Sequence, residues 1–85
     1  MPLTILYFAW VRERIGAGEE EVQTPSSVRT VADLIDWLSR RGDGYRAAFE
    51  DLSRIRAAVD QQFVPFDAPI VGGGEVAFFP PVTGG

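Results

Sequence analysis

Hydrophobic side chains follow a period of two in four stretches of the chain and a helical period in its middle. Residues 3–11 alternate between two largely apolar faces, so they predict a strand in the interior of a sheet. Residues 12–18 are polar with two glycines, which predicts a turn. Residues 19–24 alternate more weakly, with Val22 inward and an acidic face in water, and predict an edge strand paired back on the first.

The helical period is strongest in residues 30–41, where apolar residues recur at i, i+3, i+4 and i+7 from Val31. Thr30 and Asp33 match an N-terminal capping box, and arginines near the other end complement the helix dipole. This pattern predicts a helix, and Gly42 is expected to close it in the left-handed conformation. The same spacing continues more briefly after Gly42 and predicts a second, shorter helical turn.

The second half of the chain returns to strands. Residues 54–60 predict one strand, and residues 63–64 are expected to pair back on it after a turn. Residues 65–69 predict a rigid loop, and Ile70 is expected to anchor this loop to the core. The three glycines at 72–74 precede a strand, whereas a phosphate-binding loop needs a helix after it, so a tight turn is favoured.

The last predicted strand, residues 76–79, stops at Pro80 and Pro81, which have no N–H to extend a ladder. A Pro-Pro pair favours an extended conformation that leads the chain away from the sheet. At roughly 3.3 Å per residue, the stretch from residue 80 to residue 85 reaches about 20 Å. Phe79 alternates away from the predicted inward side of the strand and is expected to be exposed beside the start of this tail.

This order of elements predicts an α+β fold with two layers. The last strand must lie beside the first if one main helix is to cover a single mixed sheet, which is the β-grasp, or ubiquitin-like, arrangement. Residues 1–79 are expected to form a single domain, and residues 80–85 a flexible, extended C-terminal tail that ends in Gly84 and Gly85.

Composition narrows the possible functions. The 85 residues contain no Cys, His or Lys, which excludes thiolate nucleophiles, Cys/His metal sites, imidazole acid–base chemistry and Schiff-base lysines. A net charge of −4 argues against nucleic acid as the main partner. Neither a membrane-length apolar run nor a leader is recognisable, so a cytoplasmic location is expected.

The terminal glycine pair allows two interpretations. Chain ends are often only frayed backbone. The Pro-Pro exit favours a functional tail instead, because it keeps the glycines away from neighbouring strands. Gly84 and Gly85 have no Cβ and are therefore able to pass through a narrow channel in another protein.

Three segments resemble the small subunits of molybdopterin synthase, the MoaD-type sulfur carriers: residues 7–13 with Gly16, residues 57–60 with 63–64, and residues 75–85. The last segment, EVAFFPPVTGG, is the specific one, and the resemblance covers essentially the whole chain. The chain departs from the family at Gly74, where an acidic residue is usual, and this affects only the expected turn.

The resemblance implies a carrier that catalyses nothing alone. In this family an adenylyltransferase similar to ubiquitin-activating enzymes uses ATP to adenylate the terminal carboxylate, here that of Gly85, which then becomes a thiocarboxylate. The tail enters the large synthase subunit and gives its sulfur to cyclic pyranopterin monophosphate, which forms the dithiolene of molybdopterin. A heterotetramer of two small and two large subunits is expected, without a stably bound cofactor or metal.

The resemblance also suggests roles for other residues near the tail. Gly84 is expected to permit insertion into partner active sites, and the residues before it to lead the tail outward. A hydrophobic docking patch is expected beside the tail, although core filling explains Phe8 and Phe63 equally well. The candidate partner-binding residues are Phe8, Arg12, Phe63, Phe79, Pro80, Pro81, Val82 and Thr83.

Three other functions share this pattern. A sulfur carrier of thiamin synthesis has the same fold and glycine pair, but is usually shorter and lacks the Pro-Pro-Val-Thr segment. A ubiquitin-like modifier is conjugated through its terminal glycine to lysines of other proteins. A β-grasp adaptor binds through its sheet, and its tail is inert.

Overall fold

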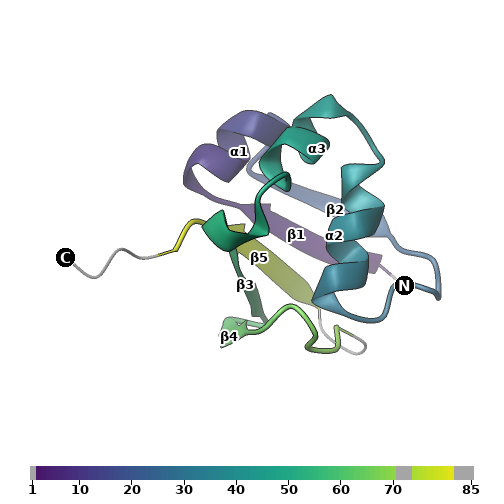
Figure 1. Cartoon of the computed structure of the whole chain (residues 1–85). Helices are drawn as coiled ribbons and strands as arrows, with labels where there is room; N and C mark the ends of the chain where they lie inside the picture. Colours follow the sequence, from purple (N-terminus) through teal and green to yellow (C-terminus); the bar gives the residue numbers. More distant parts are fainter. Residues whose placement is uncertain (1, 71–73, 82–85) are drawn as a thin grey trace.

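The computed structural model of the chain describes residues 2–70 and 74–81 (Figure 1). Within them, the strands form one five-stranded mixed sheet in the order β2-β1-β5-β3-β4, in which β5 runs parallel to β1 and every other neighbouring pair is antiparallel. The elements are β1 (Pro2–Tyr7), α1 (Ala9–Ile15), β2 (Glu19–Gln23), α2 (Val31–Ser39), α3 (Asp43–Ala48), the 3₁₀ turn η1 (Leu52–Arg54), β3 (Arg56–Val59), β4 (Gln62–Val64) and β5 (Glu75–Phe79).

The helices cover one face of this sheet (Figure 1). Alternate residues of the central strands turn towards the helices and form the core with the apolar stripe of α2. The predicted α+β fold and the pairing of the last strand with the first are therefore confirmed. The most deeply buried side chains include Ile5, Tyr7, Val11, Val31, Leu34, Leu38, Ile55, Val76 and Phe78.

The first helix, α1, was missed by the sequence prediction of a strand over residues 3–11 and a turn after it. The strand ends at Tyr7, and Ala9 adopts a positive φ of 54° that turns the chain into the helix. Val11 is buried and Ile15 packs against the core, which is the i, i+4 spacing of a helix. Val11 by itself also continues the alternation of the preceding strand, so the pattern of residues 3–11 did not reveal the helix. Gly16 ends the helix with φ 92°, and its N–H donates to the Arg12 carbonyl.

The main helix agrees with its prediction at its start and differs at its end. The Thr30 hydroxyl accepts from the Asp33 N–H and the Asp33 carboxylate accepts from the Thr30 N–H, so the capping box is confirmed. The prediction that Gly42 closes the helix in the left-handed region was wrong. Arg40 caps the helix in a right-handed conformation, and Gly42, with φ 167°, is extended backbone that leads directly into α3.

The returning strands follow the sequence prediction with shorter bounds. The strand predicted for residues 54–60 is β3, which starts at Arg56 because residues 52–54 form η1. The predicted return of residues 63–64 is β4, paired antiparallel with β3, and Ile70 is buried as expected. The turn predicted at the three glycines falls largely on residues 71–73, which lie outside the described residues.

The edge strand β2 carries its acidic residues in two environments. Glu19 and Glu21 are exposed, as predicted, whereas Glu20 shares the inward face with Val22 and is half-buried. Its carboxylate accepts hydrogen bonds from the hydroxyls of Tyr7 and Tyr45 and from the Arg41 guanidinium. Burial alone raises the pKa of Glu20, but these three donors outweigh it, so that the pKa lies below its ordinary value.

We expect Gly44→Ala to destabilise the fold by about 1–3 kcal/mol, because a Cβ at residue 44 would lie 2.6 Å from the Arg14 carbonyl oxygen and force α3 away from α1. The control is Gly42→Ala, whose Cβ meets only the Tyr45 ring at 3.7 Å on extended backbone. Urea unfolding of both variants measures the difference. Equal stabilities would show that the helices do not depend on this close approach.

We expect Glu20→Gln to lower stability at neutral pH and to matter less in acid. Because the folded pKa of Glu20 is lowered, its contribution is present above the ordinary value of 4.5 and is lost as the pH falls through the folded value. Urea unfolding of the wild type and the variant at neutral pH and at about pH 3 tests this. A difference that grows on acidification would contradict it. The matched control is Glu21→Gln, on the exposed face of the same strand.

Candidate functional site

The pairing of β5 with β1 places the start of the tail. The Phe8 N–H donates to the Phe78 carbonyl at 3.1 Å, directly after the last paired residues of the two parallel strands. β5 ends at Phe79, and Pro80 and Pro81 follow as half-buried residues. The predicted sulfur-carrying residue Gly85, together with Val82, Thr83 and Gly84, lies outside the described residues.

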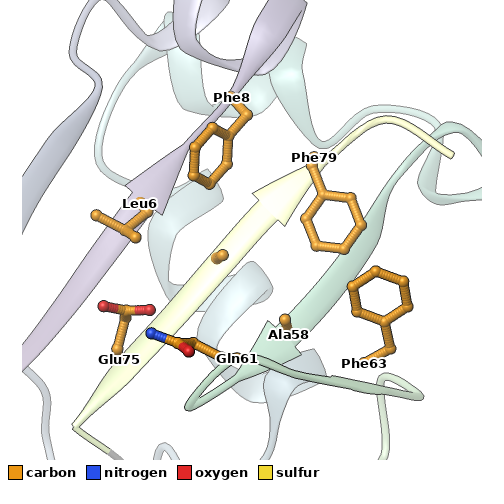
Figure 2. Close-up of a pocket in the computed structure, with 8 residues that line it drawn as sticks. Leu6, Phe8, Ala58, Gln61, Phe63, Glu75 and Phe79 are labelled. Atoms are coloured by element: carbon orange, nitrogen blue, oxygen red, sulfur yellow. The ribbon is translucent and has the colours of Figure 1, made fainter. Parts of the chain in front are cut away.

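An open groove of about 400 Å³ lies next to this point, on the sheet face opposite the helices. Figure 2 shows the rings of Phe79 and Phe63 on one side of the groove and the ring of Phe8 on the other. Phe8 is 48% exposed and Phe63 is 77% exposed, which excludes core filling for both. The groove is lined by Leu6, Phe8, Ala58, Gln61, Phe63, Glu75, Ala77 and Phe79.

Small and large residues alternate to shape the groove. Ala58 and Ala77 are paired across β3 and β5 and form its floor, because neither has a side chain that rises above the sheet. Phe63 is paired with Ala58 on the other side, and its ring centroid lies 5.2 Å from that of Phe79. Two aromatic walls around an alanine floor leave an apolar surface that water covers in the isolated chain.

The far end of the groove is polar. Gln61 and Glu75 lie beside each other there, away from the tail (Figure 2). The turn between β3 and β4 positions them: Asp60 and Gln61 have φ of 48° and 71°, and Asp60 Oδ1 accepts from the N–H groups of Gly74 and Glu75 at 3.0 and 3.2 Å. An occupant of this groove therefore meets apolar surface near the tail and polar groups at the other end.

Three of the predicted docking residues, Phe8, Phe63 and Phe79, line one groove. Arg12 is exposed on α1 but does not line the groove, since its side chain lies over Gly18, where a Cβ would be 3.1 Å from the Arg12 Nε. A contact by Arg12 stays a prediction. The alanine floor and the polar end were not predicted, although alternation along β3 and β5 assigns Ala58, Ala77 and Glu75 to the same face of the sheet.

No helix in the described ranges has the length and hydrophobicity needed to cross a membrane. The described residues likewise contain no group of three or more Asp or Glu side chains placed to hold a metal ion.

Comparisons with known proteins agree with this geometry. The model of the ThiS family matches residues 5–85. The molybdopterin synthase sulfur carrier subunit of Escherichia coli is 43% identical, over 98% of this chain and 99% of its own. A Pyrococcus furiosus structure described as a putative molybdopterin converting factor, subunit 1, has a TM-score of 0.77 at 29% identity, and covers 96% of this chain and 99% of its own.

The fold has a further relative in SAMP1 of Haloferax volcanii. That structure has a TM-score of 0.72 at 24% identity and covers both chains completely, which supports the fold alone. The predicted β-grasp arrangement and the resemblance to molybdopterin synthase sulfur carriers are both confirmed. This chain belongs to the ThiS family.

Proposed function

We propose that this chain is the sulfur-carrier small subunit of a molybdopterin synthase. The observation that carries the proposal is its 43% identity to a curated carrier subunit over almost the entire length of both proteins. The family match extends to residue 85, the residue proposed to hold the sulfur. On this proposal the domain presents one reactive backbone atom, and partner proteins supply the catalytic groups.

The chemistry begins at the carboxylate of Gly85. A terminal carboxyl group has a pKa of about 3.3–3.7, so it is an anion at neutral pH and a poor acyl donor. An adenylyltransferase joins it to the α-phosphate of ATP and releases pyrophosphate, which makes a mixed anhydride. The outer sulfur of a persulfide then displaces AMP and forms an acyl disulfide. A second thiol cleaves its S–S bond, which leaves a thiocarboxylate on Gly85 and a disulfide on the sulfur donor. The absence of Lys and Cys from the sequence means that no such side chain competes for the activated terminus.

The thiocarboxylate delivers its sulfur within the large synthase subunit. Gly84 and Gly85 enter its active site, where cyclic pyranopterin monophosphate accepts sulfur and the dithiolene of molybdopterin is built. The groove beside the tail, with its walls of Phe8, Phe63 and Phe79, is suited to dock an apolar segment of that subunit. We place this assembly in the cytoplasm and propose that it contains two small and two large subunits.

A thiamin-pathway carrier and a protein modifier are the alternatives. The match to the ThiS family does not by itself separate these functions, and the similarity to SAMP1 concerns the fold alone. The reaction product separates them: a thiocarboxylate consumed by cyclic pyranopterin monophosphate supports the proposal. Transfer of the sulfur to a thiazole precursor would support the thiamin-pathway carrier instead. Isopeptide conjugates on other proteins would support the protein modifier.

We expect incubation with the activating enzyme, ATP, a persulfide donor and a thiol reductant to exchange one oxygen for sulfur at the C-terminus. Intact-mass spectrometry measures the exchange, and removal of Gly85 should abolish it. Gly84→Phe should leave the fold unchanged and block the reaction, because a bulky side chain cannot follow the tail into a narrow channel. A truncated chain that still supported molybdopterin formation would refute the tail as the sulfur carrier.

We expect Phe63→Ser to weaken binding to the large subunit by about thirtyfold, which corresponds to the about 2 kcal/mol typical of an aromatic hot spot. Because Phe63 is 77% exposed, the fold should tolerate the change. Gln62→Ser is the control, since it alters the adjacent residue of β4 outside the groove. Isothermal titration calorimetry with the purified large subunit gives both affinities, and an unchanged affinity for Phe63→Ser would exclude the groove as the docking site.

A further inference from the structure

A cluster of one aromatic and two basic side chains lies on the helix side of the tail. The guanidinium carbon of Arg14 is 5.5 Å from the centre of the Trp10 ring, and that of Arg54 is 5.1 Å from it. Trp10 is half-buried against the core, while both arginines are exposed. The ring is thus fixed by the fold, and it holds two cations at the surface.

The cluster joins two elements, α1 and η1, that lie on either side of the start of the tail. β5 lies between β1 and β3 in the sheet, and its C-terminal end leads into Pro80. α1 follows the neighbouring end of β1, and η1 precedes β3, whose Arg56 is paired with Phe79. The contact between Trp10 of α1 and Arg54 of η1 therefore lies next to the C-terminal end of β5. Figure 1 shows η1 close to the start of the tail.

Neither cation of the cluster forms an ion pair within the described residues, although Arg54 adds to the Ser53 hydrogen bonds that lower the pKa of Asp51. Within the described ranges the ion pairs join Arg40 to Asp36 and Arg41 to Glu20, and neither involves Arg14 or Arg54. In a chain with net charge −4, two guanidinium groups that converge on one ring form a local positive surface. Such a surface attracts carboxylate groups of a partner.

The groove alone is too small to account for a stable subunit contact. Eight residues line it, whereas stable interfaces use about 20–30 residues on each side. A partner that admits the tail must surround its origin, so the additional contact area lies on both faces of the sheet next to Pro80. On the side opposite the groove, this area contains Trp10, Arg14 and Arg54.

We propose that Trp10, Arg14 and Arg54 form a second docking surface, the cationic collar, that binds carboxylate side chains at the mouth of the large subunit's active-site channel. This inference rests on the proposed function, because it assumes that the large subunit takes up the tail. The groove and the cationic collar then hold the partner from opposite faces of the sheet. The large subunit, rather than the activating enzyme, is the partner assigned, since a stable subunit contact needs the larger interface.

The test is a double charge reversal, Arg14→Glu with Arg54→Glu, compared with Arg29→Glu and Arg40→Glu. The control pair changes the net charge equally and lies at the two ends of α2, away from the tail (Figure 1). We measure association with the purified large subunit by stopped-flow fluorescence over a range of salt concentrations. Charges at an interface act mainly on the association rate, so we expect about tenfold slower association at low salt and a weaker salt dependence for the collar variant only.

A charge-preserving variant separates recognition from structure. Arg14→Lys with Arg54→Lys should restore most of the association rate, and the collar variants should keep the unfolding midpoint of the wild type. The control pair also loses the exposed ion pair of Arg40 with Asp36, so its midpoint is expected to fall slightly. Equal rates for the collar and control variants would overturn the proposal, as would a loss confined to the activating enzyme. Failure of the wild type to bind the large subunit would instead refute the proposed function, and thiocarboxylate formation at Gly85 reports separately on the carrier chemistry.

Discussion

The parallel pairing of β1 with β5 is the contact on which the rest of this structure depends. Parallel neighbours cannot be joined by a tight turn, so the whole chain between them serves as the crossover. Ile5 opposite Val76 and Tyr7 opposite Phe78 are buried in the centre of the core. Because both strands end at the same edge of the sheet, Phe8 and Phe79 finish near each other, and the tail starts between α1 and β3.

The two faces of the sheet have different surroundings because the helices cover only one of them. On the covered face, the Phe78 ring packs against Tyr7 and Phe49 with centroids 6.3 and 5.1 Å away. On the open face, alanines on β3 and β5 lie between aromatic residues and leave the groove. Burying such an apolar surface against a partner is favourable by about 25 cal/mol per Å². This free energy remains available for assembly, because the groove stays exposed when the chain folds.

The region around the start of the tail combines two kinds of surface. The groove is apolar near Phe79, and the cationic collar of Trp10, Arg14 and Arg54 lies on the opposite face of the sheet. The aromatic walls of the groove and the two arginines of the collar supply neither a nucleophile nor a general base, since phenylalanine is inert and arginine stays protonated. This division fits a protein that positions one backbone group for chemistry performed by others.

The sequence alone determined the strands β2 to β5, the helix α2 with its capping box, and the family, because these depend on local periodicity and on a specific C-terminal motif. It did not reveal α1, since an apolar stretch such as residues 7–11 fits both a strand and the first turn of a helix. It also did not decide whether Phe8 and Phe63 are exposed. Alternation assigns a residue to a face of the sheet, but it does not show whether other elements cover that face. Only the tertiary structure placed all the helices on one face, left the other open, and brought Arg54 to Trp10, a contact between residues far apart in the chain.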